Sequence, residues 1–188
     1  MKENTKKENT KKELFSWAKT IGFTLVLIAI IRGVLFTPSL VQGESMMPTL
    51  ENNERVLVNK IGYSISGLER FDIIVFHGKE GYDLVKRVIG LPGDTVEYEN
   101  DVLYVNGKAM EEPYLKEFKE KAAGRVLTPD FTLEQITGKT KVPEGQVFVL
   151  GDNREVSKDG RMFGFISEDE IVGKGQAVFW PLKQVRAL

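Results

Sequence analysis

Apolar and polar positions follow three patterns along the chain. Residues 14–36 are mostly apolar, whereas residues 1–12 consist almost only of Lys, Glu, Asn and Thr. From residue 55 onward, short runs rich in β-branched residues alternate with Gly, Pro, Asn and Asp turn signals, which is typical of strands. This pattern breaks over residues 108–142, which are highly charged and contain two prolines. The sequence therefore predicts an apolar helix followed by a mostly β body with an inserted cap.

The predicted strands are short β-branched runs closed by turn residues. A helix is predicted inside the cap at 114–123, and Asn106-Gly107 is a hairpin turn signal. No repeat or linker divides the body, which predicts one domain over 37–188 with an insertion at about 108–142. The strands are expected at 55–60, 71–76, 84–90, 95–98, 102–105, 146–150 and 177–181.

The apolar stretch 14–36 has the length of a membrane anchor. As a helix it would extend roughly 34 Å, at about 1.5 Å per residue. Lysines precede it, which places its N-terminal end in the cytoplasm. A cleaved signal peptide and a buried helix are the alternatives, but no small-x-small cleavage site follows at 35–40. We therefore expect a disordered cytoplasmic tail at 1–13, a single uncleaved anchor in the cell membrane at 14–36, and an extracytoplasmic domain at 37–188.

Composition narrows the chemistry that this domain can perform. The 188 residues carry 26 basic and 27 acidic side chains, and this balance argues against a nucleic-acid partner. Cysteine is absent, which removes thiol nucleophiles and thiolate metal sites. His77 is the single histidine, and no phosphate-binding glycine motif occurs. No metal or organic cofactor is therefore expected.

Ser45 lies between Gly43 and Pro48, where the apolar stretch gives way to the strands. Such a serine often only shapes a turn. As a nucleophile it would need a base, because a serine hydroxyl is weakly nucleophilic by itself. The usual base is histidine. His77, however, is expected in an exposed loop at the end of a strand.

Lys86 is the other candidate base. Strand alternation puts its side chain on the same face as Leu84 and Val88, which indicates burial. Desolvation lowers the pKa of a lysine, so a buried Lys86 would become a base near neutral pH. The alternative is a lysine on an edge strand that discourages strand addition. Spacing alone leaves both interpretations open.

Several segments, in their order along the chain, resemble the conserved boxes of bacterial type I signal peptidases. The resemblance runs from about residue 20 to the C-terminus and is closest to the compact Gram-positive form. It implies a coiled β-sheet catalytic domain with a small inserted cap and one N-terminal transmembrane helix. The segments are Ser-Met-Met-Pro-Thr at 45–49, Phe-Asp-Ile-Ile-Val-Phe at 71–76, Lys-Arg-Val-Ile-Gly-Leu-Pro-Gly-Asp at 86–94 and Gly-Asp-Asn-Arg at 151–154.

The resemblance implies a role for each matching residue. Ser45 matches the nucleophile and Lys86 the general base, whereas Ser157 matches a serine that orients the lysine through a hydrogen bond. Gly43 stands where some members carry a serine hydroxyl that helps to bind the oxyanion, so that donor is missing here. Gly160 stands where the family commonly has serine, which predicts weaker support but not loss of activity. The matching polar residues around the site are Asp152, Asp159 and Arg161, expected to form a partly buried ion-pair network.

The implied activity is that of a membrane-anchored serine endopeptidase that removes signal peptides after Ala-x-Ala-like sites. Its partners would be secretory preproteins and membrane lipids. An extended substrate would add as a strand beside Ser45 and Lys86, with alternate side chains in shallow apolar pockets. The alternative is a catalytically inactive outer-face binding or assembly module on the same scaffold, which should have lost the serine or the lysine. The suggested pocket walls are Leu40, Val41, Ile74 and Val88.

Overall fold

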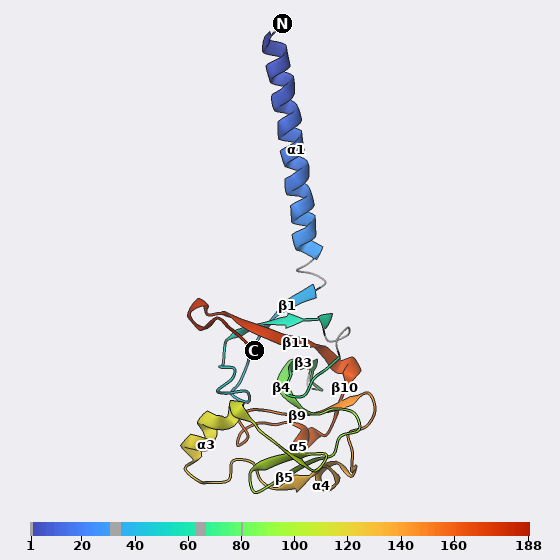
Figure 1. Cartoon of the computed structure of the whole chain (residues 1–188), viewed down its shortest axis with the longest axis vertical. Coiled ribbons are helices and arrows are strands. Elements are labelled where there is room, and N and C mark those ends of the chain that lie inside the picture. The colour runs from blue at the N-terminus through green and yellow to red at the C-terminus, as the bar shows by residue number, and fades with distance from the viewer. Residues whose placement is uncertain (1, 31–34, 63–66, 80) are drawn as a thin grey trace.

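The computed structural model describes residues 2–30, 35–62, 67–79 and 81–188. It contains one long N-terminal helix and a strand-rich body (Figure 1). The helices are α1 (Lys2–Ile30), η2 (Pro113–Leu115), α3 (Lys116–Ala122), α4 (Leu133–Thr137), α5 (Gly160–Phe163), η3 (Glu168–Glu170) and η4 (Leu182–Gln184). The strands are β1 (Phe36–Leu40), β2 (Arg55–Asn59), β3 (Ile73–His77), β4 (Asp83–Gly90), β5 (Val96–Glu99), β6 (Val102–Val105), β7 (Lys108–Met110), β8 (Phe131–Thr132), β9 (Gln146–Leu150), β10 (Ile166–Ser167), β11 (Ile171–Trp180) and β12 (Arg186–Ala187).

The larger sheet carries the segments that the sequence singles out. Its order is β1-β2-β11-β3-β4-β9-β10, with β12 paired to β11, and the pairings are antiparallel. β4 lies between β3 and β9, and Ile74 pairs with Lys86 across the β3–β4 ladder. The predicted mostly β fold is confirmed. The ladder with β9 begins at Arg87, but Lys86 is only 2% exposed, so its interpretation as a lysine that keeps an exposed strand edge polar is wrong.

A second antiparallel sheet, of order β7-β6-β5-β8, forms the end of the body away from α1 (Figure 1). The hairpin predicted at Asn106-Gly107 is present, with β6 paired to β7 and positive φ at both turn residues. The smaller sheet begins at Val96, so the unit that we expected at about 108–142 starts earlier along the chain. Alternation identifies strands but does not show which sheet a strand joins. The predicted cap helix appears as η2 and α3.

The described residues form three hydrophobic cores, one of which packs Ile74, Phe76, Val88, Val147 and Val149 of β3, β4 and β9 against Ile166 and Ile171. A second core joins the smaller sheet to β4 and β9, with Tyr98, Phe131 and Phe148 in aromatic contact. The third packs β2, β3 and β11 against the segment after β1 and includes Met46 and Leu50. The strands missed in the sequence are mostly two or three residues long, too short for alternation to be recognised.

α1 includes the residues at its N-terminal end for which composition predicts a disordered tail. Lys and Glu are good helix formers, and an adjoining helix removes the cost of nucleation, which accounts for the difference. Across the described residues, no helix combines the length and the apolar character needed to cross a bilayer. Residues 31–34 of the predicted anchor lie outside the described residues.

Candidate active site

Ser45 is held in a tight turn that follows β1. The Met47 amide donates to the Glu44 carbonyl at 3.2 Å, and the Leu50 amide donates to the Met46 carbonyl at 2.9 Å. Met46 and Leu50 are buried in the core, whereas Ser45, which directly precedes Met46, is half-buried. Packing of these two apolar side chains therefore presents the serine at the surface of the body.

Lys86 meets Ser45 from β4. Its Nζ lies 2.7 Å from Ser45 Oγ and 3.0 Å from the Val85 carbonyl oxygen. The residue is only 2% exposed, and this burial lowers its pKa to about 8, although the negative charges of Asp159 and Asp152 act in the opposite direction. A lysine with this pKa is partly neutral near pH 7 and can accept a proton from the hydroxyl that it contacts.

His77 has a different partner. Its exposed ring places Nδ1 2.8 Å from Asp83 Oδ1, across the end of the β3–β4 ladder. The side chain that contacts the Ser45 hydroxyl is Lys86. The geometry therefore favours Lys86 over His77 as the base.

Asp152 is fully buried behind this pair. Its carboxylate accepts two hydrogen bonds from Arg87, at 2.8 and 2.6 Å, and one from Thr49 Oγ1 at 2.5 Å. Arg87 follows Lys86 in β4, and Thr49 ends the turn that begins at Ser45. The carboxylate therefore connects the segments that carry the two candidate catalytic residues.

Asp159 and Arg161 form the rest of the predicted ion-pair network. Arg161 donates to Asp159 from Nε and Nη2, both at 2.9 Å, and also to the Arg154 carbonyl at 2.8 Å. The Gly151 amide donates to Asp159 at 3.0 Å. The side chain of Asp159 also caps α5 by accepting from the Arg161 amide. The network thus holds both ends of the segment 151–161.

Ser157 does not make the hydrogen bond to Lys86 that the resemblance implies. Its buried Oγ has no partner among the residues that the structure describes. A Cβ added to Gly151 would lie 2.1 Å from this oxygen and 2.5 Å from the Ser45 carbonyl, so the hydroxyl packs against the glycine backbone. Lys86 instead contacts Ser45 and the Val85 carbonyl.

Gly43 lines the cleft beside Ser45 in a conformation that suits glycine. Its φ is +91°, and its amide donates to Asn52 Oδ1 at 3.0 Å. Because the Gly43 amide already donates to Asn52, it does not replace the oxyanion-binding serine hydroxyl that the resemblance implies at this position.

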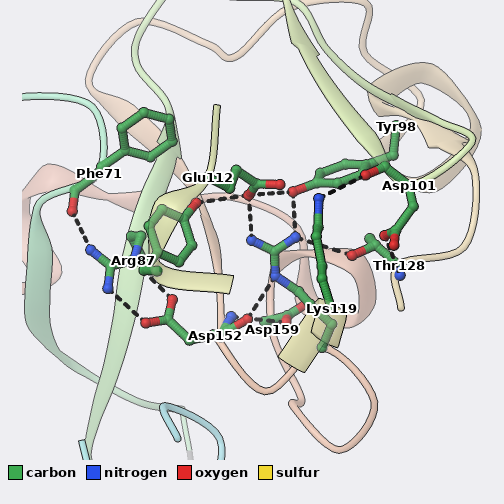
Figure 2. A network of polar contacts seen from close by, with 12 residues as sticks. Phe71, Arg87, Tyr98, Asp101, Glu112, Lys119, Thr128, Asp152 and Asp159 are labelled. Atoms are coloured by element: carbon green, nitrogen blue, oxygen red, sulfur yellow. Dashed lines mark hydrogen bonds and ion pairs between the residues drawn. The ribbon is translucent and has the colours of Figure 1, made fainter. Parts of the chain in front are cut away.

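A larger buried network, which no sequence pattern indicated, joins the site to the smaller sheet (Figure 2). Glu112 accepts hydrogen bonds from Arg154 at 2.7 Å, from Tyr98 at 2.5 Å and from Tyr114 at 2.7 Å. Arg87 stacks on the ring of Tyr114, with its guanidinium carbon 3.9 Å from the ring centroid. Burial raises the pKa of both tyrosines, and their phenol groups remain hydrogen-bond donors. Burial of a glutamate in a charged segment cannot be read from local pattern.

Two hollows of different size meet at Ser45 and Lys86. The smaller has a volume of about 60 Å³ and the larger about 550 Å³, and both are lined by Gln42, Ser45, Tyr82, Leu84 and Lys86. Leu40 and Val41 line the smaller hollow as expected, with Met46 and Val85. Ile74 and Val88 are completely buried in the core, so their suggested role as pocket walls is wrong. The larger hollow adds Phe76, Phe163 and Ile166, with Val156, Lys158 and Glu170 among its other residues.

Comparisons with known proteins agree with this geometry. A family model described as signal peptidase, peptidase S26, matches residues 14–180. A signal peptidase I of Bacillus caldolyticus is 54% identical over 158 residues, covering 84% of this chain and 87% of that protein. A signal peptidase IB of Staphylococcus aureus strain Mu50 is 47% identical over 180 residues, covering 94% of each. The crystal structure of a signal peptidase I from Enterococcus faecalis V583 has a TM-score of 0.55 at 47% identity, and the match covers 57% of this chain and 95% of that one.

Proposed function

This chain belongs to the signal peptidase S26 family, and on that premise we propose that it cleaves signal peptides from exported preproteins with Ser45 as nucleophile and Lys86 as general base. The observation that carries the assignment is the 2.7 Å contact between Lys86 Nζ and Ser45 Oγ, made by a lysine that is almost fully buried. A serine hydroxyl beside a partly neutral amine is suited to acyl transfer, because the amine can take the hydroxyl proton as the oxygen attacks. An inactive binding module would have no need of this pair.

Acylation follows from the contact between the two side chains. Ser45 Oγ attacks the scissile carbonyl carbon while neutral Lys86 takes the hydroxyl proton, which leaves an oxyanion and a lysine ammonium. Lys86 then returns the proton to the leaving nitrogen as the C–N bond breaks. The mature protein departs with a free amino terminus, and the signal peptide remains as an ester on Ser45.

Deacylation uses the same base. Water loses a proton to Lys86 and attacks the ester carbonyl, and the proton passes to Ser45 Oγ as the ester bond breaks. For the oxyanion we assign the Ser45 amide, for which no acceptor is found in the described part of the chain. The Gly43 amide already donates to Asn52 Oδ1, so we assign no second oxyanion donor at this position.

Ser157 retains its proposed role in orienting Lys86, but only in the complex with substrate. A buried hydroxyl without a partner is unfavourable, and hydrogen bonds of catalytic groups often form only when substrate is bound. Once Lys86 Nζ has given its proton to the leaving group, it needs a new hydrogen-bond partner. Ser157 packs against Gly151 beside the Ser45 carbonyl, and its unpaired hydroxyl is our candidate to provide one.

The two hollows give a physical basis for a small-x-small specificity. A substrate strand lying between the segment 40–43 and the start of β4 would direct alternate side chains to opposite sides. The smaller hollow, at about 60 Å³, is the more restrictive of the two, which suits small side chains such as alanine at the first and third positions before the bond. The larger hollow would take the intervening side chain, x, and accommodates many sizes.

We also propose that residues 14–36 form a single membrane anchor, with the N-terminus in the cytoplasm and residues 37–188 on the outer face. Support comes from the apolar composition of this stretch and the lysines that precede it. The exposed apolar side chains on α1, among them Phe15, Trp17 and Phe23, have no protein core to pack against. A lipid environment would cover them.

The test is cleavage of a preprotein by the full-length protein in detergent, comparing the parent with Ser45→Ala and Lys86→Ala. We expect cleavage after the Ala-x-Ala site by the parent, and no cleavage by either variant while circular dichroism shows that both are folded. His77→Ala tests the alternative base and should still cleave at the same site, because His77 lines the larger hollow but its Nδ1 contacts Asp83. Near-normal activity of Lys86→Ala would refute the dyad, and an inert parent on several preproteins would favour the binding module.

A further inference from the structure

Glu112 forms an ion pair that is buried between the smaller sheet and the catalytic segments. It follows β7 and pairs with Arg154 at 2.7 Å, and both side chains are essentially inaccessible to solvent. Glu112 Oε2 has no hydrogen-bond partner among the described residues. Buried pairs of this kind contribute little net stability, because desolvation offsets their attraction. A role in holding one specific geometry explains the pair better than stabilisation does.

Arg154 belongs to the short loop 151–154 that contacts the nucleophile. Its Nε donates to the Gly151 carbonyl at 2.9 Å, which closes the loop on itself. Within the same loop, the Asn153 amide donates to the Ser45 carbonyl at 3.0 Å, and Asn153 Nδ2 donates to the Glu44 carbonyl at 3.2 Å. The position of the Ser45 backbone therefore depends on the loop that Arg154 closes.

A second route leads from Glu112 to the base. The Tyr114 hydroxyl donates to Glu112, and its ring stacks on Arg87, the residue after Lys86. Arg87 in turn donates twice to Asp152, in the same loop as Arg154. The carboxylate of Glu112 is thus connected to the neighbour of Lys86 and to the loop that contacts Ser45.

We propose that Glu112 is a positioning residue for catalysis, and that the smaller sheet serves to hold the Ser45 and Lys86 segments in register through Arg154 and Tyr114. The inference rests on the proposed function, but it concerns residues outside the substrate-binding hollows. Catalytic groups need to be held within about 0.5 Å of their productive geometry, and a displacement of about 1 Å can reduce the rate roughly a hundredfold.

The test is Glu112→Gln in the full-length protein, with Glu111→Gln as the matched control. Gln keeps the size and an acceptor oxygen but removes the charge, while Glu111 is the exposed neighbouring residue. We expect kcat to fall about tenfold or more while KM changes less than about threefold. Here kcat is divided by the concentration of active enzyme, which is titrated from the initial burst of the first product. Hydrogen exchange should accelerate in residues 44–50 and 151–157 and remain unchanged in β1. The control should match the parent in both measurements.

The double variant Glu112→Leu/Arg154→Met distinguishes a positioning role of Glu112 from a purely structural role. Replacing a buried ion pair by apolar side chains usually preserves or increases stability, so this protein should remain folded. Our proposal expects it to lose kcat nonetheless. It is overturned if Glu112→Gln keeps kcat within about twofold and shows parental exchange, or if the folded double variant has parental kcat. If the parent itself cleaves nothing, the proposed function fails, and the exchange comparison still decides whether Glu112 positions the loop.

Discussion

The acid limb of the pH–rate profile should report the pKa of Lys86. Burial lowers this pKa from 10.5 to about 8, against the opposing charges of Asp159 and Asp152. With that value, about one molecule in ten carries a neutral Lys86 at pH 7, and about nine in ten at pH 9. If the neutral amine is the base, kcat/KM should rise roughly tenfold over this interval.

The same shift should appear in the stability of the protein. Between pH 8 and 10.5 the unfolded chain binds a proton at this lysine that the folded protein does not, so stability rises with pH across that window. Below pH 8 the folded state carries the full cost of the buried charge, roughly 3 kcal/mol for a shift of this size. Lys86→Met removes that cost and loses the hydrogen bonds to Ser45 and the Val85 carbonyl, worth about 1 kcal/mol each at most.

The assay is cleavage of an internally quenched Ala-x-Ala peptide from pH 5 to 10.5, with denaturant unfolding of the parent and of Lys86→Met over the same range. We expect an acid-limb pKa near 8. We also expect the variant to be inactive but more stable than the parent by about 1–2 kcal/mol at pH 7, with this advantage lost as the pH approaches 10.5. A flat kcat/KM from pH 5 to 9, or a variant less stable than the parent at neutral pH, would show that the lysine is not held as a neutral base.

Two further predictions concern substrate choice and the C-terminal strand. Val156→Trp should narrow the larger hollow, so kcat/KM should fall about tenfold more for a peptide with Phe at x than for a peptide with Ala at x. The control is Val126→Trp, because Val126 is 60% exposed and Val156 is 58% exposed. This control should affect the two peptides equally. Arg186→Met should reduce the free energy of unfolding by about 2 kcal/mol at pH 7, because Arg186 donates two hydrogen bonds to the buried Glu54. The loss stays below that for a fully buried pair, because the Arg186 side chain is 35% exposed and solvent screens its charge. Burial would raise the pKa of Glu54, but Arg186 and the Glu51 amide lower it below 4.5, so the part of the parent's advantage that comes from this ion pair should be lost as the pH falls through that lowered pKa. The hydrogen bonds from Arg186 to the Thr49 and Gln184 carbonyls do not depend on the ionisation of Glu54. An equal loss at pH 3 and pH 7 in urea titrations would contradict this account.

Much of the fold was accessible from the sequence because its signals are local. β-Branched runs and turn residues located β2, β3, β4, β5, β6 and β9 within a few residues. The alternation of Leu84, Lys86 and Val88 left burial and an exposed strand edge open for the lysine, and the structure shows that Lys86 is buried. Two-residue strands such as β8 and β10 carry too few positions for any periodicity, and they were missed.

The sequence by itself determined the mostly β body and, through its resemblance to a family, the two residues proposed for catalysis. Only the tertiary structure decided that Ser157 Oγ has no partner among the described residues, that Ile74 and Val88 lie in the core, and that Glu112 reaches Arg154 from another sheet. These facts depend on contacts between residues far apart in the chain, which the register of β3 on β4 and the packing of two sheets establish. Periodicity and turn chemistry record only what neighbouring residues require, and so they do not contain that information.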